Sequence, residues 1–490
     1  MAEIQKRKMK IALDSVPFGT PEENELWRTE KKVTLPAGVD NKQILKDTFR
    51  IAWPSLVELT LTQLASMVDL MMVGRLNYQA LTAVGLTTQP IFLLISMVIA
   101  LNVGATALVA RYKGAGEQEK ANKVLRQALL MTFSISLVMT ALGILFARPL
   151  VLFMGALEDT VDDAEVYLRI RMYALTAFSL TATITATLRG VGDSRTAMIY
   201  NVVANVVNVI FNYLLIYGHL GFPRLEVAGA AWATIIGQFA AFGMALFAIL
   251  KKRKNGYLHL EPSKGFRPHK ETLLGIAQIG MPSMIEQLIM RAGIIIFAKT
   301  VADLGTMAYA THQVCMNIQA LSFMIGNAIA VSSTSLVGQS LGKKRGDMAR
   351  LYRSKTAEFG LVCSAVLMAV FFFFGKQIVM LYNEEPEVIR IGGYLMMFVA
   401  FTQPFQGVQF ILAGALRGAG DTRSIAVISF ITVLGVRTCL ALLLVKVAGL
   451  GLYGAWTAMA ADQIIRTLLV SLRYRSRKWM LFKLHGESAA

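Results

Sequence analysis

Cysteine and charge are both scarce in this sequence of 490 residues. Asp, Glu, Lys and Arg make up 16% of the chain, whereas 55% is hydrophobic and the mean hydropathy is +0.53. A chain of this length that is so apolar is not a soluble globular protein. The cysteines Cys315, Cys363 and Cys439 stand in apolar runs without the spacing of metal ligands, so we predict buried small side chains rather than a metal site.

Motifs of nucleotide hydrolysis and covalent catalysis are also lacking. The glycine phrases at 190–192 and 418–420 are too short for a phosphate fingerprint, and they join two apolar stretches rather than a strand and a helix. The sequence shows no Walker motif, zinc cluster or nucleophilic triad. Residues 1–47 lack an apolar h-region, so no cleavable signal peptide is expected. These absences argue against an ATP-driven pump and against an enzyme, and no cofactor is expected.

Apolar stretches of about 20 residues, long enough for the roughly 30 Å hydrocarbon core of a bilayer, recur along the chain. We predict an all-α polytopic membrane protein with twelve transmembrane helices in two pseudo-symmetric six-helix bundles, 48–250 and 275–472. A tail (1–47), a linker (251–274) and a second tail (473–490) complete the chain. The predicted spans are 48–73, 87–111, 125–147, 166–188, 196–218, 227–250, 275–301, 313–338, 357–380, 391–415, 424–446 and 452–472.

A long internal repeat relates the two halves. Residues Leu188–Thr196 (LRGVGDSRT) return 228 positions later as Leu416–Ser424 (LRGAGDTRS). The same offset relates Pro54 to Pro282, Glu58 to Glu286 and Leu108 to Leu336. Repeats of this size in a membrane chain are typical of secondary carriers, whose substrate site lies where the halves face each other. Six spans per half place both halves in the same direction, with the symmetry axis along the membrane normal.

The net charge of +18 could suggest a nucleic-acid partner, but the distribution of the basic residues argues against one. Basic residues gather in alternate loops, and the intervening loops carry acids. This is the positive-inside pattern, and it places both tails and the linker in the cytoplasm of a multi-pass plasma-membrane protein. The basic segments are 111–126, 251–270, 343–355 and 473–478, and the acidic ones are 158–165 and 384–387.

An ionisable residue inside a membrane span is costly and commonly marks function. The clearest is Asp69, in the first predicted span, for which the sequence shows no cationic neighbour. Such a carboxylate could exchange a proton or a metal cation with a cationic substrate. The alternative is a structural hydrogen bond between helices near the end of the span. The position of Asp69 in the sequence favours neither interpretation over the other.

Asparagine recurs along the fifth predicted span at intervals of four, three and four residues. This spacing lines one face of a helix with amides, which must face protein or a wet cavity rather than lipid. Amides can hold helices together, and they can position water, a cation or a substrate. We favour a cavity beside Asp69. The residues are Asn201, Asn205, Asn208 and Asn212.

Taken together, three motifs resemble the multidrug and toxic compound extrusion (MATE) family over about residues 45–475. They are the phrase Pro54…Val68-Asp69…Val73-Gly74-Arg75-Leu76…Ala80-Leu81, the paired Leu-Arg-Gly-x-Gly-Asp turns, and Ala310-Thr-His-Gln313. The resemblance implies a V-shaped carrier of two six-helix bundles around a central cavity. It also implies export of varied, often cationic compounds in exchange for H+ or Na+.

The resemblance assigns roles to individual residues. It implies an ion-coupling site at Asp69, Asn208, Asn212 and Thr234, and a helix hinge at Pro54. One subgroup carries a second acid where this chain has Asn212, which can coordinate or donate a hydrogen bond but cannot titrate. No resident metal is expected, and Na+ at Asp69 is the alternative to a proton.

A sodium-coupled subgroup has acids in the C-terminal half that this chain lacks. They would fall near Met290 and at Gln406. Glu286 lies one turn before Met290, so either a shifted role for Glu286 or a pair between Glu286 and Arg291 is open. These departures favour coupling through Asp69 and favour protons. Candidate residues of the substrate cavity are Asn205, Gln406, Glu286 and Met290.

Two functions are compatible with these features. The first is a secondary multidrug exporter of cationic and amphipathic compounds, a monomer in the lipid bilayer that works by alternating access with H+ or Na+. The second is a lipid-linked oligosaccharide flippase, which needs basic residues at the cavity centre and commonly additional helices. Twelve spans and an interior of amides and carboxylates favour the exporter. Arg437 and Asp462 are predicted partners within the C-terminal half.

Overall fold

The computed structural model describes residues 11–20, 22–23, 35–36, 39–76, 78–156, 158, 160–251, 256–382 and 384–482. All regular secondary structure in these residues is helical, and the predicted all-α fold is confirmed. The two predicted tails and the linker lie partly outside the described residues, so their cytoplasmic placement stays a prediction.

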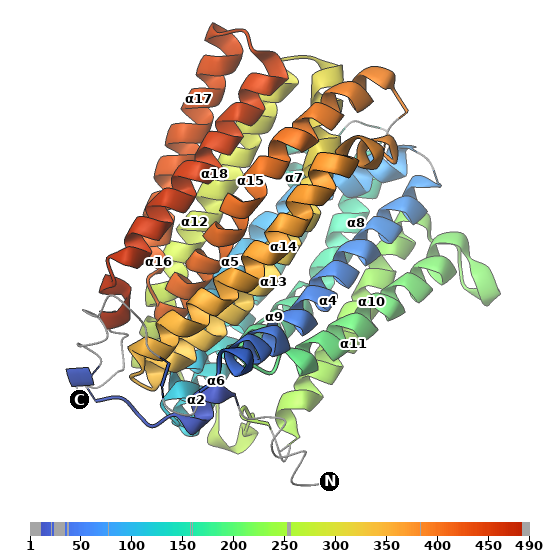
Figure 1. The fold of residues 1–490 in the computed structure, drawn as a ribbon. Helices are drawn as coiled ribbons and strands as arrows, with labels where there is room; N and C mark the ends of the chain where they lie inside the picture. The colour runs from blue at the N-terminus through green and yellow to red at the C-terminus, as the bar shows by residue number, and fades with distance from the viewer. Residues whose placement is uncertain are drawn as a thin grey trace. The chain divides into compact units, whose positions relative to one another are not determined.

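Ten predicted spans correspond to single helices (Figure 1). They are α4 (Asn41–Gly74), α5 (Tyr78–Gly114), α6 (Gln118–Leu145), α10 (Ser194–Tyr217), α11 (Glu226–Leu250), α12 (Lys270–Ala302), α13 (Thr306–Gly342), α14 (Gly346–Met380), α15 (Pro386–Ala419) and α18 (Gly451–Arg475). Short helices α2 (Ala12–Ser15) and α7 (Ala147–Phe153) stand apart from them.

The fourth and eleventh predicted spans are helices with an interruption. The fourth is α8 (Val161–Tyr173) followed by α9 (Leu175–Gly190). The eleventh alternates α-helix and π-helix: α16 (Thr422–Ser429), η3 (Phe430–Thr438), α17 (Cys439–Leu442) and η4 (Leu443–Val447). π-Helical turns are rare and commonly accompany functional sites.

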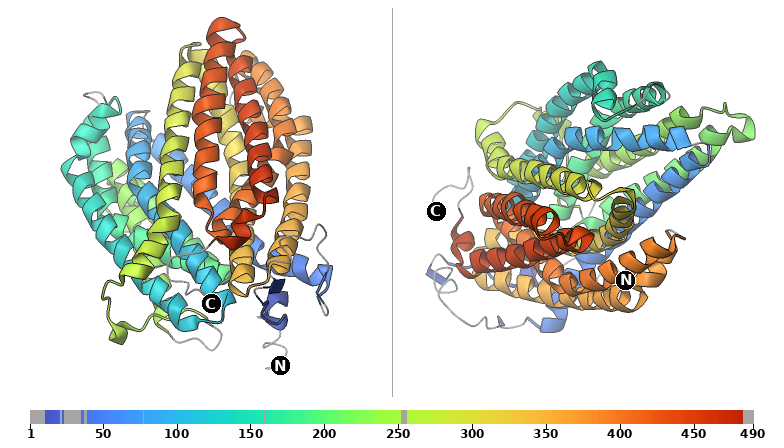
Figure 2. Two further views of the ribbon diagram at one scale, coloured as in Figure 1. Left: turned by 90° about the vertical axis from the view of Figure 1, so that its left-hand side faces the viewer. Right: turned by 90° about the horizontal axis from the view of Figure 1, so that it is seen from above.

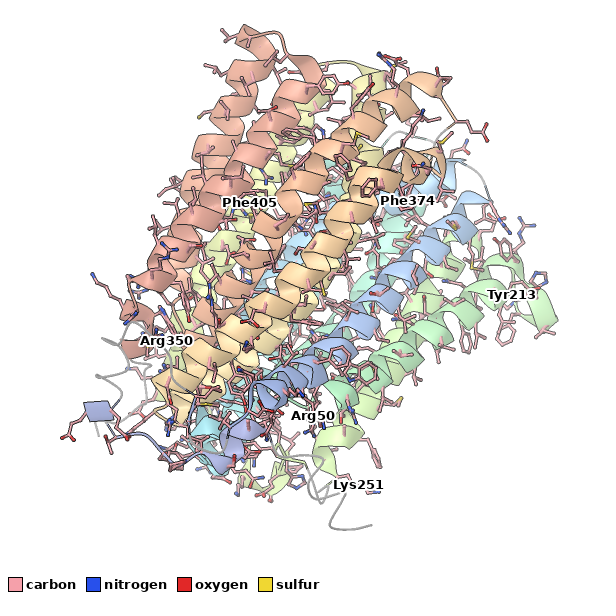
Figure 3. The ribbon with its side chains drawn as sticks, in the orientation of Figure 1. Arg50, Tyr213, Lys251, Arg350, Phe374 and Phe405 are labelled. Carbon is pink, nitrogen blue, oxygen red and sulfur yellow. The ribbon has the colours of Figure 1, made fainter. Side chains whose placement is uncertain are left out.

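Among the described residues, nine helical segments are long and apolar enough to cross a membrane. The other three predicted spans are α8 with α9, α12, and α18. Large apolar side chains on the helix surfaces suit contact with lipid. Phe374 and Phe405, for example, are 57% and 39% exposed (Figure 3). Of the cysteines, Cys315 is buried as predicted, whereas Cys439 is exposed on the eleventh span.

The chain forms two compact units. The N-terminal unit is Val57–Gly280, and the C-terminal unit combines Met1–Leu56 with Met281–Leu484. The chain passes between the units inside α4, next to Pro54, and inside α12, next to Pro282. The bundle bounds predicted from the sequence, 48–250 and 275–472, therefore stay a prediction. In the C-terminal unit, α13, α14 and α15 run side by side (Figure 2).

The repeat is visible in how the helices pack. In the N-terminal unit Thr106 Oγ1 on α5 donates to the carbonyl oxygen of Ala186 on α9 at 3.1 Å. In the C-terminal unit Thr334 Oγ1 on α13 donates to the carbonyl oxygen of Gly414 on α15 at 2.9 Å. Both pairs are related by the offset of 228 residues. The duplicated sequence thus specifies the same contact between helices twice.

Gly418 brings α15 close to α13. A Cβ atom at Gly418 would lie 2.3 Å from the carbonyl oxygen of Thr334, a backbone atom that cannot rotate away. We expect Gly418→Ala to lower the free energy of unfolding by about 1–3 kcal/mol through overpacking. Thermal denaturation of the purified protein in detergent checks this. Gly243→Ala on α11 is the matched control, because nothing lies within 4 Å of its added Cβ. Equal midpoints for the two variants would contradict the prediction.

The repeated glycine turns share a second feature. Gly192 and Gly420 have φ values of 80° and 88°, in the left-handed region that favours glycine. Asp193 then caps α10 by accepting from Thr196 N at 3.3 Å, whereas Asp421 pairs with Arg473 at 2.7 Å. Asp193 thus stabilises its own turn, whereas Asp421 ties the second turn to the end of α18.

The arginines of the same phrases pair with buried glutamates. Arg189 pairs with Glu58 at 2.7 Å, and Arg417 pairs with Glu286 at 2.7 Å. Both glutamates are buried. A buried carboxylate needs a counter-charge, and each half supplies the same one. The repeated Glu58 and Glu286 therefore share one structural place in the two halves.

Part of the predicted N-terminal tail is packed into the C-terminal unit. The backbone N–H of Ala12 donates to Asp47 Oδ2 at 2.6 Å, and that of Leu13 donates to the Tyr352 hydroxyl at 3.2 Å. Lys343 Nζ donates to the carbonyl oxygen of Leu13 at 2.7 Å, and burial lowers the pKa of Lys343. These contacts fix the start of α4 to the ends of α13 and α14.

Candidate ion-coupling site

The asparagine face of α10 lies along α4. Asn201 Nδ2 donates to Glu58 Oε1 at 2.6 Å, Asn205 Nδ2 donates to Thr62 Oγ1 at 3.0 Å, and Asn212 Nδ2 donates to Asp69 Oδ1. The partners are 143 residues apart in all three bonds, so α4 and α10 run parallel in one register. The amides make contacts between helices, the alternative that the sequence left open. The predicted cavity beside them stays a prediction.

Asp69 is held by two amides of α10. Asn212 is fully buried, and Asn208, one turn earlier, is 6% exposed. With its amide nitrogen directed at the carboxylate, Asn208 Nδ2 lies 2.9 Å from Oδ1 and 3.2 Å from Oδ2 of Asp69. In that orientation the Asn208 carbonyl oxygen accepts from the backbone N–H of Thr234 on α11 at 3.3 Å. The structure thus brings together the four residues that the resemblance assigns to ion coupling.

An apolar layer adjoins the site toward the C-terminal end of α4. Its buried members Val73, Ile216 and Ala230 pack together, with Tyr167 of α8 against them. Val73, Ile216 and Ala230 each lie four residues, about one helical turn, from a site residue: Asp69, Asn212 and Thr234 respectively.

The same step of one turn identifies a further site residue. Short turns join α9 to α10 and α10 to α11, so α8 with α9, and α11, run opposite to α10. Along α10 the step from the apolar layer to the site runs toward lower residue numbers, so along the antiparallel α8 it runs toward higher ones. The residue one turn beyond Tyr167 is Arg171, which therefore lies at the level of Asp69. Arg171 is within electrostatic reach of Asp69. The buried Nε and Nη1 of Arg171 have no hydrogen-bond partner in the described part of the chain.

Arg171 corrects the expectation that Asp69 has no cationic neighbour. The counter-charge comes from another helix, 102 residues further along the chain. A signal for it was present, because Arg171 falls inside the predicted span 166–188 and a charge within a span seldom lacks a partner. What the sequence alone could not give is the rotation of α8 that directs Arg171 toward Asp69.

A comparison with known protein families identifies the family of the chain. A model of the family described as MatE matches residues 54–214 and again residues 282–443. The two matches begin at Pro54 and Pro282, which the 228-residue offset relates. The chain belongs to the MATE family. The resemblance of its motifs to that family is thereby confirmed.

Named relatives of this MATE protein come from several bacteria. It is 30% identical over 440 residues to a probable multidrug resistance protein NorM of Thermotoga maritima, covering 89% of this chain and 93% of the relative. It is 28% identical over 392 residues to the multidrug resistance protein PmpM of Pseudomonas aeruginosa, covering 79% and 81%. It is 27% identical over 414 residues to the multidrug resistance protein MdtK of Yersinia enterocolitica, covering 83% and 90%.

Solved structures show the same fold. A multidrug resistance MATE transporter in an outward-facing conformation superposes with a TM-score of 0.82 at 20% identity, covering 94% of this chain and 99% of that chain. A MATE structure in the straight conformation gives a TM-score of 0.83 at 21% identity, covering 95% and 100%. The predicted MATE fold is confirmed.

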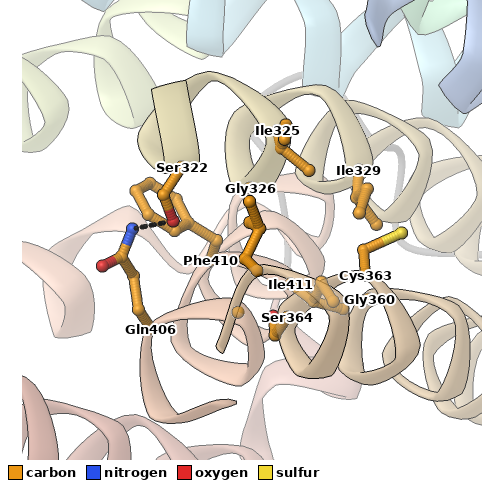
Figure 4. A pocket seen from close by; sticks show the side chains of 12 residues that line it. Ser322, Ile325, Gly326, Ile329, Gly360, Cys363, Ser364, Gln406, Phe410 and Ile411 are labelled. Atoms are coloured by element: carbon orange, nitrogen blue, oxygen red, sulfur yellow. Dashed lines mark hydrogen bonds between the residues drawn. The ribbon is translucent and has the colours of Figure 1, made fainter. Parts of the chain in front are cut away.

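The candidate cavity residues of the C-terminal half take part in separate contacts. Gln406 on α15 is 1% exposed, and its Nε2 donates to Ser322 Oγ on α13 at 3.3 Å, beside a small pocket (Figure 4). Glu286 pairs with Arg417, as described above. Met290 Sδ accepts a hydrogen bond from Arg466 Nη1 at 3.4 Å. Asn205 lies in the other unit, on α10.

The C-terminal unit of this MATE protein contains a buried charge cluster. Arg437 pairs with Asp462, as predicted, with Nη2 2.5 Å from Oδ2. Arg466, which the sequence analysis missed, also binds Asp462, with Nη2 2.6 Å from Oδ1. Arg466 Nε donates to Thr432 Oγ1 at 3.1 Å. One carboxylate thus serves two guanidiniums.

Proposed function

We propose that this MATE protein is a secondary multidrug exporter of the plasma membrane. It moves cationic and amphipathic organic compounds outward in exchange for protons. The family and the multidrug names of its relatives support the substrate class. The Asp69 site supports the coupling, because a buried carboxylate held by neighbouring helices can change their packing when its charge changes.

The hydrogen bonds around Asp69 favour a proton over Na+. Both Asn208 and Asn212 donate N–H groups to the carboxylate. Na+ is a hard cation that needs several oxygen ligands directed toward it, whereas a proton needs a single carboxylate oxygen. Protonation of Asp69 removes the charge that those N–H groups stabilise. The contact between α4 and α10 is then weakened at the level of the site.

Alternating access requires that the drug and the proton each bind the inward and outward states differently. In the proposed cycle the ionised Asp69 belongs to the state that holds the organic cation. A proton that reaches Asp69 from outside favours release. Pro54 removes a backbone hydrogen bond of α4 close to the point where the chain passes between the units, so the proposed hinge lies where bending costs least.

The lipid-linked oligosaccharide flippase receives no support from the relatives, whose names refer to multidrug resistance. The proposal is tested with purified protein in proteoliposomes and ethidium as a fluorescent organic cation. A pH gradient without Na+ and a Na+ gradient at constant pH are imposed separately. We expect export with the pH gradient alone. Export with the Na+ gradient alone would overturn proton coupling, and export with neither would overturn the exporter.

A further inference from the structure

Arg171 is the site residue that neither the family motifs nor the sequence pattern assigned. It lies at the C-terminal end of α8, just before the interruption at Ala174. Two of its guanidinium nitrogens are buried without an acceptor in the described residues. Burying guanidinium nitrogens without an acceptor is costly, and the carboxylate of Asp69 within electrostatic reach offsets part of that cost.

The groups that face Asp69 can be named element by element. They are Tyr167 and Arg171 from α8 and the amides of Asn208 and Asn212 from α10, while Thr234 of α11 reaches the site through Asn208. Among these groups Arg171 alone carries a formal charge. With Asp69 ionised, the site is neutral. With Asp69 protonated, the site has a net charge of +1, because a guanidinium does not give up its proton in a protein.

We propose that Arg171 is a positioning residue for ion coupling: it holds Asp69 ionised until a proton arrives, and so sets the pH range in which the exporter works. The inference rests on the function proposed above. Protonation of Asp69 leaves Arg171, a partly buried cation, without its counter-charge. The free energy of that uncompensated charge favours a rearrangement of α8 against α4 and α11, which is the step that a coupled exporter needs.

The test compares Arg171→Met, Arg171→Lys and wild type. Ethidium export from proteoliposomes is measured over a series of pH values at a constant pH difference across the membrane. An opposite charge close by shifts a carboxylate's titration by about 1–3 units, so we expect the midpoint for Arg171→Met to move at least about 1 unit toward higher pH. Arg171→Lys keeps the positive charge and should stay close to wild type.

The matched control is Arg169→Met, on the same helix two residues earlier. Arg169 is 48% exposed at its side chain and pairs with Glu165 at 2.8 Å, so the control removes an arginine from α8 without touching the site. Its pH profile should be that of wild type. An unchanged midpoint in Arg171→Met, or an equal shift in Arg169→Met, would overturn the inference.

A second measurement covers the case in which Arg171→Met no longer transports. Proton uptake by the purified protein is followed with an indicator dye in weak buffer, using Asp69→Asn to subtract other groups. An uptake midpoint shifted to higher pH in Arg171→Met supports the inference, and an unshifted one overturns it. If instead Asp69→Asn still exports ethidium on a pH gradient, the proposed function fails at Asp69. That result is distinct from a failure at Arg171.

Discussion

Replacing Asp69 by asparagine is expected to reduce ethidium export driven by a pH gradient to the level of liposomes without protein. The substituted amide keeps the size and the hydrogen-bonding capacity of the side chain but cannot bind and release a proton. The neighbouring amides of Asn208 and Asn212 can still bond to it, so the protein should remain folded, although the contact between α4 and α10 is weaker without the charge. Transport in proteoliposomes and thermal denaturation in detergent measure the two properties separately.

The control for this variant is an aspartate outside the site. Asp303→Asn makes the same chemical change at an acid that is 49% exposed at its side chain and only weakly paired with Lys446, at 3.4 Å. We expect full transport from it. Asp69→Asn with wild-type export would remove Asp69 as the coupling residue.

Replacing Asp462 by asparagine is expected to cost about 3–5 kcal/mol of folding free energy, because it leaves two buried guanidiniums without a counter-charge. Asp462 is fully buried, and Arg437 and Arg466 are 6% and 5% exposed. Arg466→Met should cost less, since a neutral pair of Arg437 and Asp462 remains. Chemical denaturation of the purified variants in detergent measures the order.

Asp303→Asn again serves as the control, because the loss of an exposed ion pair costs at most about 1 kcal/mol. If Asp462→Asn were as stable as Asp303→Asn, the triad would not contribute to the stability of the C-terminal unit. If Arg466→Met were less stable than Asp462→Asn, the contacts of Arg466 with Thr432 and Met290 would contribute more to stability than the balance of charges in the triad. Folded Asp462→Asn protein should still export ethidium, since the proposed coupling site lies in the N-terminal unit.

The sequence predicted the larger features of the fold because they depend on local properties. A helix that crosses a bilayer needs about 20 apolar residues, so hydropathy alone located the twelve spans. The glycine turns were predictable because a left-handed φ selects glycine, as at Gly192 and Gly420. The π-helical turns of η3 were not predicted, since they change the hydrogen bonding and leave the apolar composition as it was.

Only those features of the site that belong to one helix were predictable. The periodic asparagines identified the polar face of α10, and Asp69 identified the polar position of α4. The pairing of Glu286 was not predictable, since Arg291 is near in sequence whereas the observed partner, Arg417, is 131 residues away. Arg466 was not predicted for a related reason. Asp462 lies one turn away on the same helix, but the sequence pattern had assigned Arg437 as the partner of Asp462, and the carboxylate in fact binds both.

The sequence by itself determined where the membrane-spanning helices lie along the chain, their duplication, and which faces carry polar groups, because hydrophobicity and helical period are local properties of each segment. Only the tertiary structure decided which charges meet. Arg171 opposite Asp69, Arg417 on Glu286 and Arg466 on Asp462 all depend on the rotation and register of one helix against another. The rotation and register follow from side-chain packing between segments far apart in the sequence, so they cannot be inferred from one segment alone.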